Sequence, residues 1–344
     1  MAIKSCPEGI ALLAGRLNDD MKIVLRRAFC GFQGKDPYVC CDMLKLDNHP
    51  NLKLLPQNCG VMNGDRIFGG SVPGLYEYPW MVLISYTTSR GLEFKCGGSI
   101  INERYVLTAA HCIIGQKIAG VRIGEHNIKA ETDCEGTPPN VVCESRLQDI
   151  RIEKEIPHEN YTSAPIIQND IGLLKLKKPI DFTPRNARPI CLPTTKELRN
   201  MNIYGVVATV AGWGYTERGV TSDVLLSLHV PIYTNEECSK LYDRLLKGRS
   251  TDNKLCAGKT GQDACGGDSG GPLLVPGDHN GVTRYIQYGI VSYGPRICAS
   301  GYPGVYTDVS KYMTWILNNI DENKINKKTY LNGHILFSFH KLQH

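Results

Sequence analysis

The chain has 344 residues, 42% of them hydrophobic and 21% charged, which is enough for two domains or for one large domain and a small module. The net charge is +5, and Lys and Arg are scattered without a basic run, which argues against nucleic acid as a partner. No apolar stretch approaches the roughly 20 residues that a membrane-spanning helix needs, so we expect no membrane partner either.

The 14 cysteines indicate disulfides formed in an oxidising compartment. A reduced cytosolic enzyme rarely carries so many, and no Cys-x-x-Cys pair recurs as a zinc site would require. Asn160-Tyr161-Thr162 is a glycosylation sequon, which fits secretion although such triplets also arise by chance. The chain begins Met-Ala-Ile-Lys-Ser-Cys, without the apolar core of a signal peptide, so either the compartment differs or the start is missing.

The first elements along the chain form a small module followed by a linker. Residues 1–41 contain Cys6, Cys30 and the adjacent pair Cys40-Cys41, with helical stretches over 11–28. Their apolar residues are too few for a core, so disulfides must hold this module together. Residues 42–66 are polar and show no sustained period, which predicts a linker.

From Ile67 onward the pattern is that of an all-β protein. Short apolar runs alternate with Gly, Pro and Asn turns, as in a barrel or sandwich. These runs cover 80–86, 105–107, 205–210, 224–232 and 285–291. Only 309–320 has the apolar spacing of a helix. Residues 321–344 are polar apart from a patch at 335–339, and we expect a disordered tail.

Three motifs carry the residues of a nucleophilic hydrolase. Ser269 stands among small residues after Asp268, where backbone N–H groups can hold an oxyanion. A serine also needs a base and an orienting acid, for which His111 follows the run 105–107 and Asp170 precedes an apolar run. A lone His or Asp is more often a packed or solvated residue, but here all three occur in the order His, Asp, Ser of chymotrypsin-type enzymes.

Because of these motifs, residues 67–320 resemble the trypsin-like serine proteases of the chymotrypsin family. Further matches are Ile67-Phe68-Gly69-Gly70, Gly212-Trp213-Gly214 and Gly304-Val305-Tyr306. The resemblance implies two six-stranded antiparallel β-barrels with a C-terminal helix. His111 and Asp170 would come from the first barrel and Ser269 from the second, with the N–H groups of Gly267 and Ser269 as oxyanion hole. A pseudoprotease usually has this serine replaced, and Ser269 is intact.

The resemblance also implies the specificity of the enzyme. Asp263 would form the floor of the S1 pocket, where a substrate Arg or Lys completes the ion pair. Gly294 and Gly304 would leave room for that long side chain, and Ser292 with Gly294 would pair with the substrate backbone. A solvated loop acid is the alternative for Asp263.

An activation switch follows from the same resemblance. Cleavage between Arg66 and Ile67 would free the Ile67 amine, which is largely cationic at neutral pH. This amine would then pair with Asp268 and order the pocket, so that the uncut chain is a zymogen.

Residues 1–41 resemble part of the clip domain of arthropod clip-domain serine proteases, through Cys6-Pro7, Cys30-Gly31 and Pro37-Tyr38-Val39-Cys40-Cys41. These are the last four of the six clip cysteines, so we expect a truncated module and an upstream start with a signal peptide. Cys30 and Cys40 would lose their partners and stay free or mispair. The disulfides implied overall are Cys6–Cys41, Cys59–Cys191, Cys96–Cys112, Cys134–Cys143, Cys238–Cys256 and Cys265–Cys298.

Glu125 and Asn127 stand where some relatives bind calcium, and the acids Glu131, Asp133 and Glu135 are nearby. Oxygen ligands suit Ca²⁺, although a solvated acidic loop is the alternative reading. We expect no other cofactor.

The expected function is that of a secreted endopeptidase zymogen in an arthropod haemolymph cascade, such as melanisation, Toll signalling or clotting. Its partners would be a protein substrate (another zymogen or a pro-cytokine), an upstream activating protease and a serpin inhibitor. The alternative is a non-catalytic clip-domain adaptor, against which the intact triad argues.

Overall fold

A computed structural model describes Cys6 and residues 29–33, 36–39, 46–62, 72–214, 220–246, 253–258, 268–294 and 302–321. Several residues singled out above lie outside this part of the chain: Cys40, Cys41, Arg66, Ile67, Asp263, Cys265, Gly267 and Cys298. The segment 11–28 and residues 322–344 lie outside it as well.

The first half of the catalytic domain is a seven-stranded antiparallel sheet of order β10-β11-β5-β4-β3-β6-β9. Its strands are β3 (Met81–Thr88), β4 (Gly91–Asn102), β5 (Tyr105–Thr108), β6 (Ile118–Ile123), β9 (Gln148–Ile150), β10 (Ile152–Pro157) and β11 (Gly172–Leu176). Only Arg151 separates β9 from β10, so one continuous stretch of chain supplies both edge strands of the sheet. The first half was predicted as a six-stranded barrel; it is a half-barrel, a seven-stranded sheet whose two edge strands β9 and β10 are not paired with each other.

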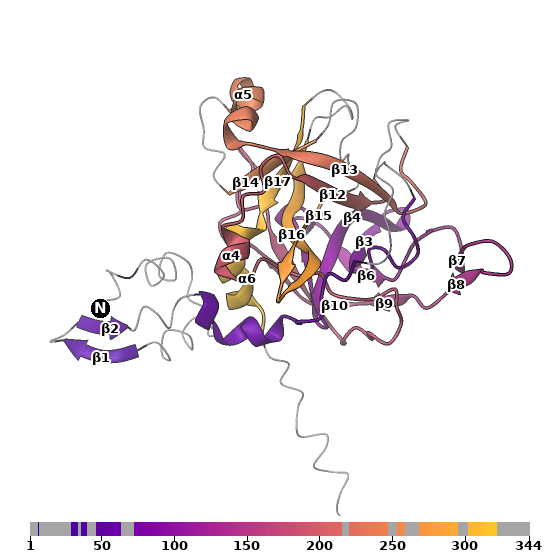
Figure 1. The fold of residues 1–344 in the computed structure, drawn as a ribbon, viewed down its shortest axis with the longest axis horizontal. Helices are drawn as coiled ribbons and strands as arrows, with labels where there is room; N and C mark the ends of the chain where they lie inside the picture. Colours follow the sequence, from indigo (N-terminus) through magenta and orange to yellow (C-terminus); the bar gives the residue numbers. More distant parts are fainter. Residues whose placement is uncertain are drawn as a thin grey trace, which may run out of the picture.

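The second half is a closed barrel of order β12-β13-β14-β17-β16-β15. Its strands are β12 (Val207–Gly212), β13 (Leu226–Tyr233), β14 (Lys254–Ala257), β15 (Pro272–His279), β16 (Val282–Tyr293) and β17 (Gly304–Asp308). One core of buried aliphatic and aromatic side chains lies mainly in the first half and extends to Leu274 and Ile290 of the second, and another lies mainly within the second half. The predicted all-β, chymotrypsin-like fold is confirmed, and Figure 1 shows the two halves packed together.

The remaining elements are short. They are β1 (Phe29–Gln33), β2 (Asp36–Val39), β7 (Asp133–Glu135), β8 (Val142–Glu144), α4 (Lys196–Arg199), α5 (Asn235–Leu246), α6 (Met313–Asn319), and the 3₁₀ turns η2 (Leu46–Asn48), η3 (Pro50–Leu54), η4 (Ala110–Cys112) and η5 (Val309–Lys311). The predicted C-terminal helix is thus divided into η5 and α6. The hairpin β7–β8 projects from the body of the domain (Figure 1). No helix in the described ranges is long and apolar enough to cross a membrane.

The predicted linker 42–66 is not a free connection over its described residues, 46–62. His49 is buried and its Nε2 lies 2.9 Å from Asn318 Oδ1 of α6. The Asn51 amide donates to the carbonyls of Leu317 (2.9 Å) and Ile320 (2.8 Å), which lie at the end of α6. The segment is therefore anchored by hydrogen bonds to carbonyls left free at a helix end, and not by a periodic hydrophobic face. Composition alone does not reveal such contacts.

The tail predicted to begin at residue 321 also needs a correction at its first position. Asp321 accepts a hydrogen bond from the Tyr105 hydroxyl at 2.7 Å and forms an ion pair with Lys175 at 2.9 Å. These contacts fix Asp321 on the first half of the domain, because they satisfy two partly buried polar groups of β5 and β11.

Replacing Asn51 by Ala tests the role of this capping contact. The variant leaves two helix-end carbonyls without their donor, so we expect the free energy of unfolding to fall by about 1–2 kcal/mol. Chemical denaturation followed by tryptophan fluorescence measures it. The exposed Gln116, changed to Ala, serves as control and should alter stability little. Equal stabilities of Asn51→Ala and wild type would contradict the anchoring role.

Candidate active site

The predicted base and its orienting acid are hydrogen-bonded to each other. β5 ends at Thr108 and leads into η4, which carries His111, while Asp170 immediately precedes Ile171 and β11. The His111 Nδ1 lies 2.8 Å from Asp170 Oδ2, and the His111 backbone N–H donates to Oδ1 at 2.9 Å. Asp170 is 2% exposed, and an ionised carboxylate can only accept, so Nδ1 carries the proton and Nε2 is free to act as a base.

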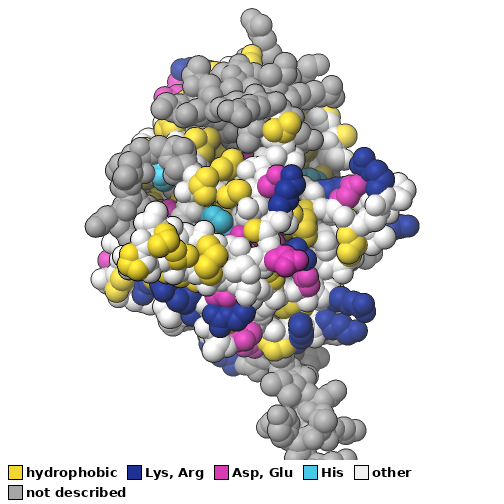
Figure 2. Space-filling view, turned by 90° about the vertical axis from the view of Figure 1, so that its right-hand side faces the viewer, with side chains coloured by type: hydrophobic (Ala, Val, Ile, Leu, Met, Phe, Trp, Pro, Cys, Tyr) yellow, Lys and Arg dark blue, Asp and Glu magenta, His cyan; other side chains and the backbone are white. Residues whose placement is uncertain are grey.

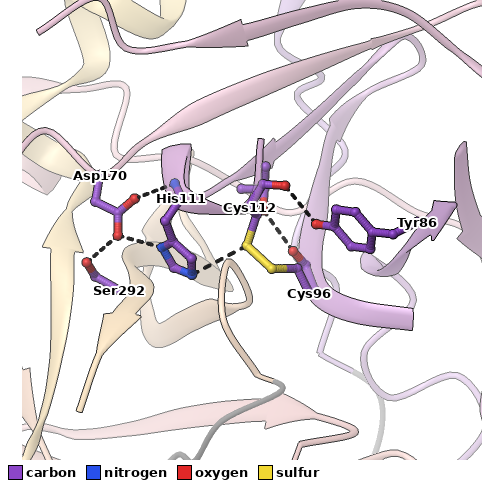
Figure 3. Close-up of a disulfide and its surroundings, with 8 residues drawn as sticks. Tyr86, Cys96, His111, Cys112, Asp170 and Ser292 are labelled. Atoms are coloured by element: carbon purple, nitrogen blue, oxygen red, sulfur yellow. Dashed lines mark hydrogen bonds and ion pairs between the residues drawn. A yellow bond between two sulfur atoms is a disulfide. The ribbon is translucent and has the colours of Figure 1, made fainter. Parts of the chain in front are cut away.

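Groups from the second half of the domain also bind Asp170. The Ser292 hydroxyl donates to Oδ2, and the Thr307 hydroxyl donates to the Asp170 carbonyl at 2.7 Å. Tyr312 donates to the side chain of Asn169, the preceding residue, at 2.8 Å. Figure 3 shows the Asp170 carboxylate between His111 and Ser292. The acid is therefore held at the junction of the two halves.

A disulfide holds the turn that presents His111. Cys96 of β4 is bonded to Cys112, and the Tyr86 hydroxyl donates to the Cys112 carbonyl at 2.8 Å. His111 Nε2 lies 3.6 Å from Cys112 Sγ, so the imidazole lies between the disulfide and Asp170 (Figure 3). These contacts limit the rotation of the histidine, as a preorganised base requires.

The chain that carries Ser269 packs against the same turn. The Ser269 carbonyl accepts from the Gly97 N–H at 2.8 Å, next to Cys96. Gly270 has φ +79°, and a Cβ there would lie 2.2 Å from Thr108 Oγ1, so this close approach requires glycine. The Ser269 hydroxyl makes no hydrogen bond to His111 within the described chain. Catalytic hydrogen bonds of unliganded sites are often long in this way.

Asp268, the predicted partner of the freed amine, points toward Gly212-Trp213-Gly214. Its Oδ1 accepts from the Gly214 N–H at 2.8 Å. A Cβ on Gly212 or Gly214 would lie 2.1 or 2.5 Å from the Asp268 carboxyl group. The two glycines therefore make room for this carboxylate, which gives that motif a physical reason.

The described residues of the predicted S1 pocket lie on adjacent strands. Ser292 is near the end of β16 and Gly294 follows it, while Gly304 begins β17. β16 and β17 are antiparallel neighbours, with Tyr293 opposite Val305. The pocket floor, Asp263, lies outside the described part of the chain.

Four of the six predicted disulfides are formed: Cys59–Cys191, Cys96–Cys112, Cys134–Cys143 and Cys238–Cys256. Cys6 is disulfide-bonded as well, but its predicted partner Cys41 is not among the described residues, and neither is the pair Cys265–Cys298. Cys30, expected to be free or mispaired, is disulfide-bonded.

Asn160 of the sequon is exposed and thus accessible to modification.

The predicted calcium ligands already have protein partners. Glu125 is buried, and burial followed by the charge of Asp133 raises the pKa of its carboxyl group. Its Oε2 lies 3.4 Å from the Arg122 guanidinium, and Asn127 Oδ1 accepts from the Lys129 N–H at 3.1 Å. Within the described ranges, Glu125 does not belong to a cluster of three His, Cys, Asp or Glu side chains. Calcium binding at Glu125 and Asn127 stays a prediction.

Some groups around Asp170 escaped the sequence analysis, namely Thr307, Tyr312 and Lys254. Thr307 directly follows the matched run Gly304-Val305-Tyr306, and Lys254 is a charged residue beginning an otherwise apolar strand, so weak signals existed. Their position beside Asp170 depends on long-range strand pairing, which spacing does not reveal.

On the face shown in Figure 2, basic and acidic side chains are interspersed rather than gathered in one patch.

The fold and these contacts define the class of the protein as a chymotrypsin-like serine hydrolase, and comparison with known proteins agrees. The trypsin family profile matches residues 67–316. "CLIP domain-containing serine protease HP8" of Bombyx mori is 40% identical, covering 87% of this chain and 85% of its own. "Melanization protease 1" of Drosophila melanogaster is 40% identical, covering 78% and 69%.

Among solved structures, the crystal structure of the Drosophila Grass clip serine protease of the Toll pathway is similar. Its TM-score is 0.70 at 34% identity, with coverage of 92% of this chain and 93% of that one. The chain therefore belongs to the clip-domain serine proteases of the trypsin family. It is a trypsin-like serine endopeptidase.

Replacing Asp170 by Asn tests the role of this carboxylate. The amide keeps the shape but favours the wrong imidazole tautomer, so kcat should fall by about 10⁴-fold, as in a related protease. Hydrolysis of an arginyl peptide substrate by the activated enzyme measures it. Asp149→Asn is the matched control, because this exposed carboxylate pairs only with surface Arg122 and should leave kcat unchanged. A loss below tenfold in Asp170→Asn would contradict the assignment.

Proposed function

We propose that this protein is a secreted protease zymogen that is cut between Arg66 and Ile67 and then cleaves a protein substrate after Arg or Lys. The observation that carries the proposal is the His111–Asp170 pair, placed at the junction of the two halves with the Ser269 backbone packed against the same turn. These are the parts of an acyl-transfer site, built from segments far apart in the sequence.

In the proposed reaction, Ser269 Oγ attacks the carbonyl carbon of the scissile bond as His111 Nε2 takes its proton. The imidazolium then gives this proton to the leaving amine, and the peptide bond breaks to leave an acyl-enzyme. Water attacks the acyl-enzyme by the same route and frees the acid. Asp170 holds the tautomer and stabilises the imidazolium throughout, and its own proton state does not change.

The oxyanion would be held by the backbone N–H groups of Gly267 and Ser269. Each such donor typically contributes about 3 kcal/mol of transition-state stabilisation. The positive φ of Gly270 supports this proposal, because it turns the chain sharply after Ser269 and brings the backbone close to Thr108 and Cys112.

The activation switch is supported by the position of Asp268. Its carboxylate lies against Gly212 and Gly214, where glycine leaves space beside it. The amine of Ile67, once freed, would supply a cation for this acid. Because Cys59 is bonded to Cys191, the N-terminal part would stay attached after the cut.

The setting we propose is an extracellular cascade of the melanisation or Toll type, on the strength of the relatives' names. In such a cascade an upstream protease would cut Arg66, the substrate would be another zymogen or a pro-cytokine, and a serpin would end the activity. Disulfides and an exposed sequon at Asn160 support secretion.

Activation is tested with Arg66→Gln. This variant should stay inert toward peptide substrates after treatment with a trypsin-like activator, whereas wild type and the control Arg90→Gln should gain activity. Arg90 is suited as control because its side chain is 84% exposed. Peptidase assays with end-group sequencing measure both activity and the new N-terminus. Full activity of Arg66→Gln would refute activation at this bond.

Specificity is tested with Asp263→Ser. Without a carboxylate for the substrate cation, kcat/KM for Arg and Lys peptides should fall at least about 100-fold, since truncating one partner of a buried charge pair costs several kcal/mol. The control Asp278→Ser alters an exposed carboxylate and should leave the preference intact. An unchanged Arg/Lys preference in Asp263→Ser would overturn the pocket assignment.

A further inference from the structure

One buried cation beside the active site has no role in the mechanism above. The Lys254 Nζ is buried and makes no hydrogen bond within the described part of the chain. An ammonium normally has three donors to satisfy, and leaving it buried without a partner is costly. Such a group calls for an explanation in terms of the charges around it.

The strand pairing places Lys254 next to the groups that hold Asp170. Lys254 of β14 is directly opposite Thr307 of β17, whose hydroxyl donates to the Asp170 carbonyl at 2.7 Å. Opposed residues on antiparallel strands have neighbouring side chains. The Lys254 Nζ also lies 5.7 Å from the ring centroid of Tyr293, which follows the Asp170 donor Ser292.

Lys254 and Asp170 line the same cavity, of about 190 Å³. The other lining residues are polar except for one and come from both halves of the domain: Ile167, Gln168, Asn169, Asn253, Ser292, Thr307 and Tyr312. His111 is not among the residues that line this cavity. A cation there faces the carboxylate without competing for the hydrogen bond to the imidazole.

We propose that Lys254 is a positioning residue of the triad, whose positive charge acts on Asp170 across the cavity that both residues line and sets how readily His111 takes up a proton. The ammonium stabilises the Asp170 carboxylate as an anion. It also opposes a second positive charge on the imidazole, so His111 stays a free base at lower pH than it would without Lys254. The proposal depends on the protease activity of the family and not on which protein is cleaved.

The charges that act on Lys254 are consistent with the proposal. Burial lowers the pKa of Lys254, and the charge of Asp170 opposes that shift and favours the ammonium. No other charged group in the described chain acts on Lys254 in this way. The interaction with the face of Tyr293 further favours a cation.

Other titratable groups around the site do not supply the same charge. Burial raises the pKa of Tyr161, and it raises those of Tyr293 and Tyr312 to about 12, so all three stay neutral across the working range. Burial lowers the pKa of His158, whose ring stands 5.5 Å from that of Tyr312. Asp308 is buried at the end of β17, and burial raises the pKa of its carboxyl group.

The test is the pH dependence of kcat/KM for Lys254→Met, measured with an arginyl peptide from pH 5 to 9 on the activated full chain. The acid limb of this pH profile should move to higher pH by about half a unit, because the His111 imidazolium forms more readily without the Lys254 ammonium. On the acid side of the limb this corresponds to about threefold lower kcat/KM than wild type, once each enzyme is normalised to its own plateau. Lys254→Arg, which keeps the charge, should restore the wild-type limb.

Lys311→Met is the matched control, since this exposed lysine lies near Asp308 but in solvent. The acid limb of the kcat/KM profile should therefore not move in this variant. A uniform loss at all pH values in Lys254→Met with an unmoved limb would show a packing role only and overturn the proposal. So would a limb that moves to lower pH. A wild-type chain that is inert after cleavage at Arg66 would instead refute the proposed function, which keeps the two failures apart.

Discussion

The buried carboxylate of Asp170 is the group on which the rest of the site depends. A charge that is 2% exposed is tolerated only when several donors meet it, and here they come from both halves of the domain. His111 approaches the carboxylate from the first half and Ser292 from the second, while Thr307 of the second half donates to the Asp170 backbone carbonyl. The same contacts therefore satisfy the acid, orient the base and join the two halves.

This arrangement explains why glycines and disulfides cluster around the site. The Ser269 backbone passes very close to β4 and β5, which Gly270 permits. The Cys96–Cys112 bond fixes the turn from the other side. Asp268 needs open space next to its carboxylate, which Gly212 and Gly214 provide. Activation, as proposed, would add the Ile67 amine beside this carboxylate.

The sequence alone was sufficient for the fold class, and it named His111 and Asp170, which the structure places in hydrogen-bond contact, because each stands in a local motif with its own signal. Strand periodicity located β3, β5, β12, β13 and β16 within a few residues. It could not locate the packing of 46–62 on α6, which depends on the side-chain amide of Asn51 reaching two helix-end carbonyls. Nor could it place Lys254 in the cavity that Asp170 also lines, since that position requires the pairing of β14 with β17.

The most direct test of the account is the reaction of the chain, cut at Arg66, with a phosphonate that carries a basic side chain and reacts with activated serines. Mass spectrometry should find the label on Ser269 at one per molecule, and His111→Ala should abolish it, because the hydroxyl is a poor nucleophile without its base. Absence of label on a correctly cut and folded wild-type chain, or equal labelling of His111→Ala, would contradict the claim that these distant side chains form one catalytic unit.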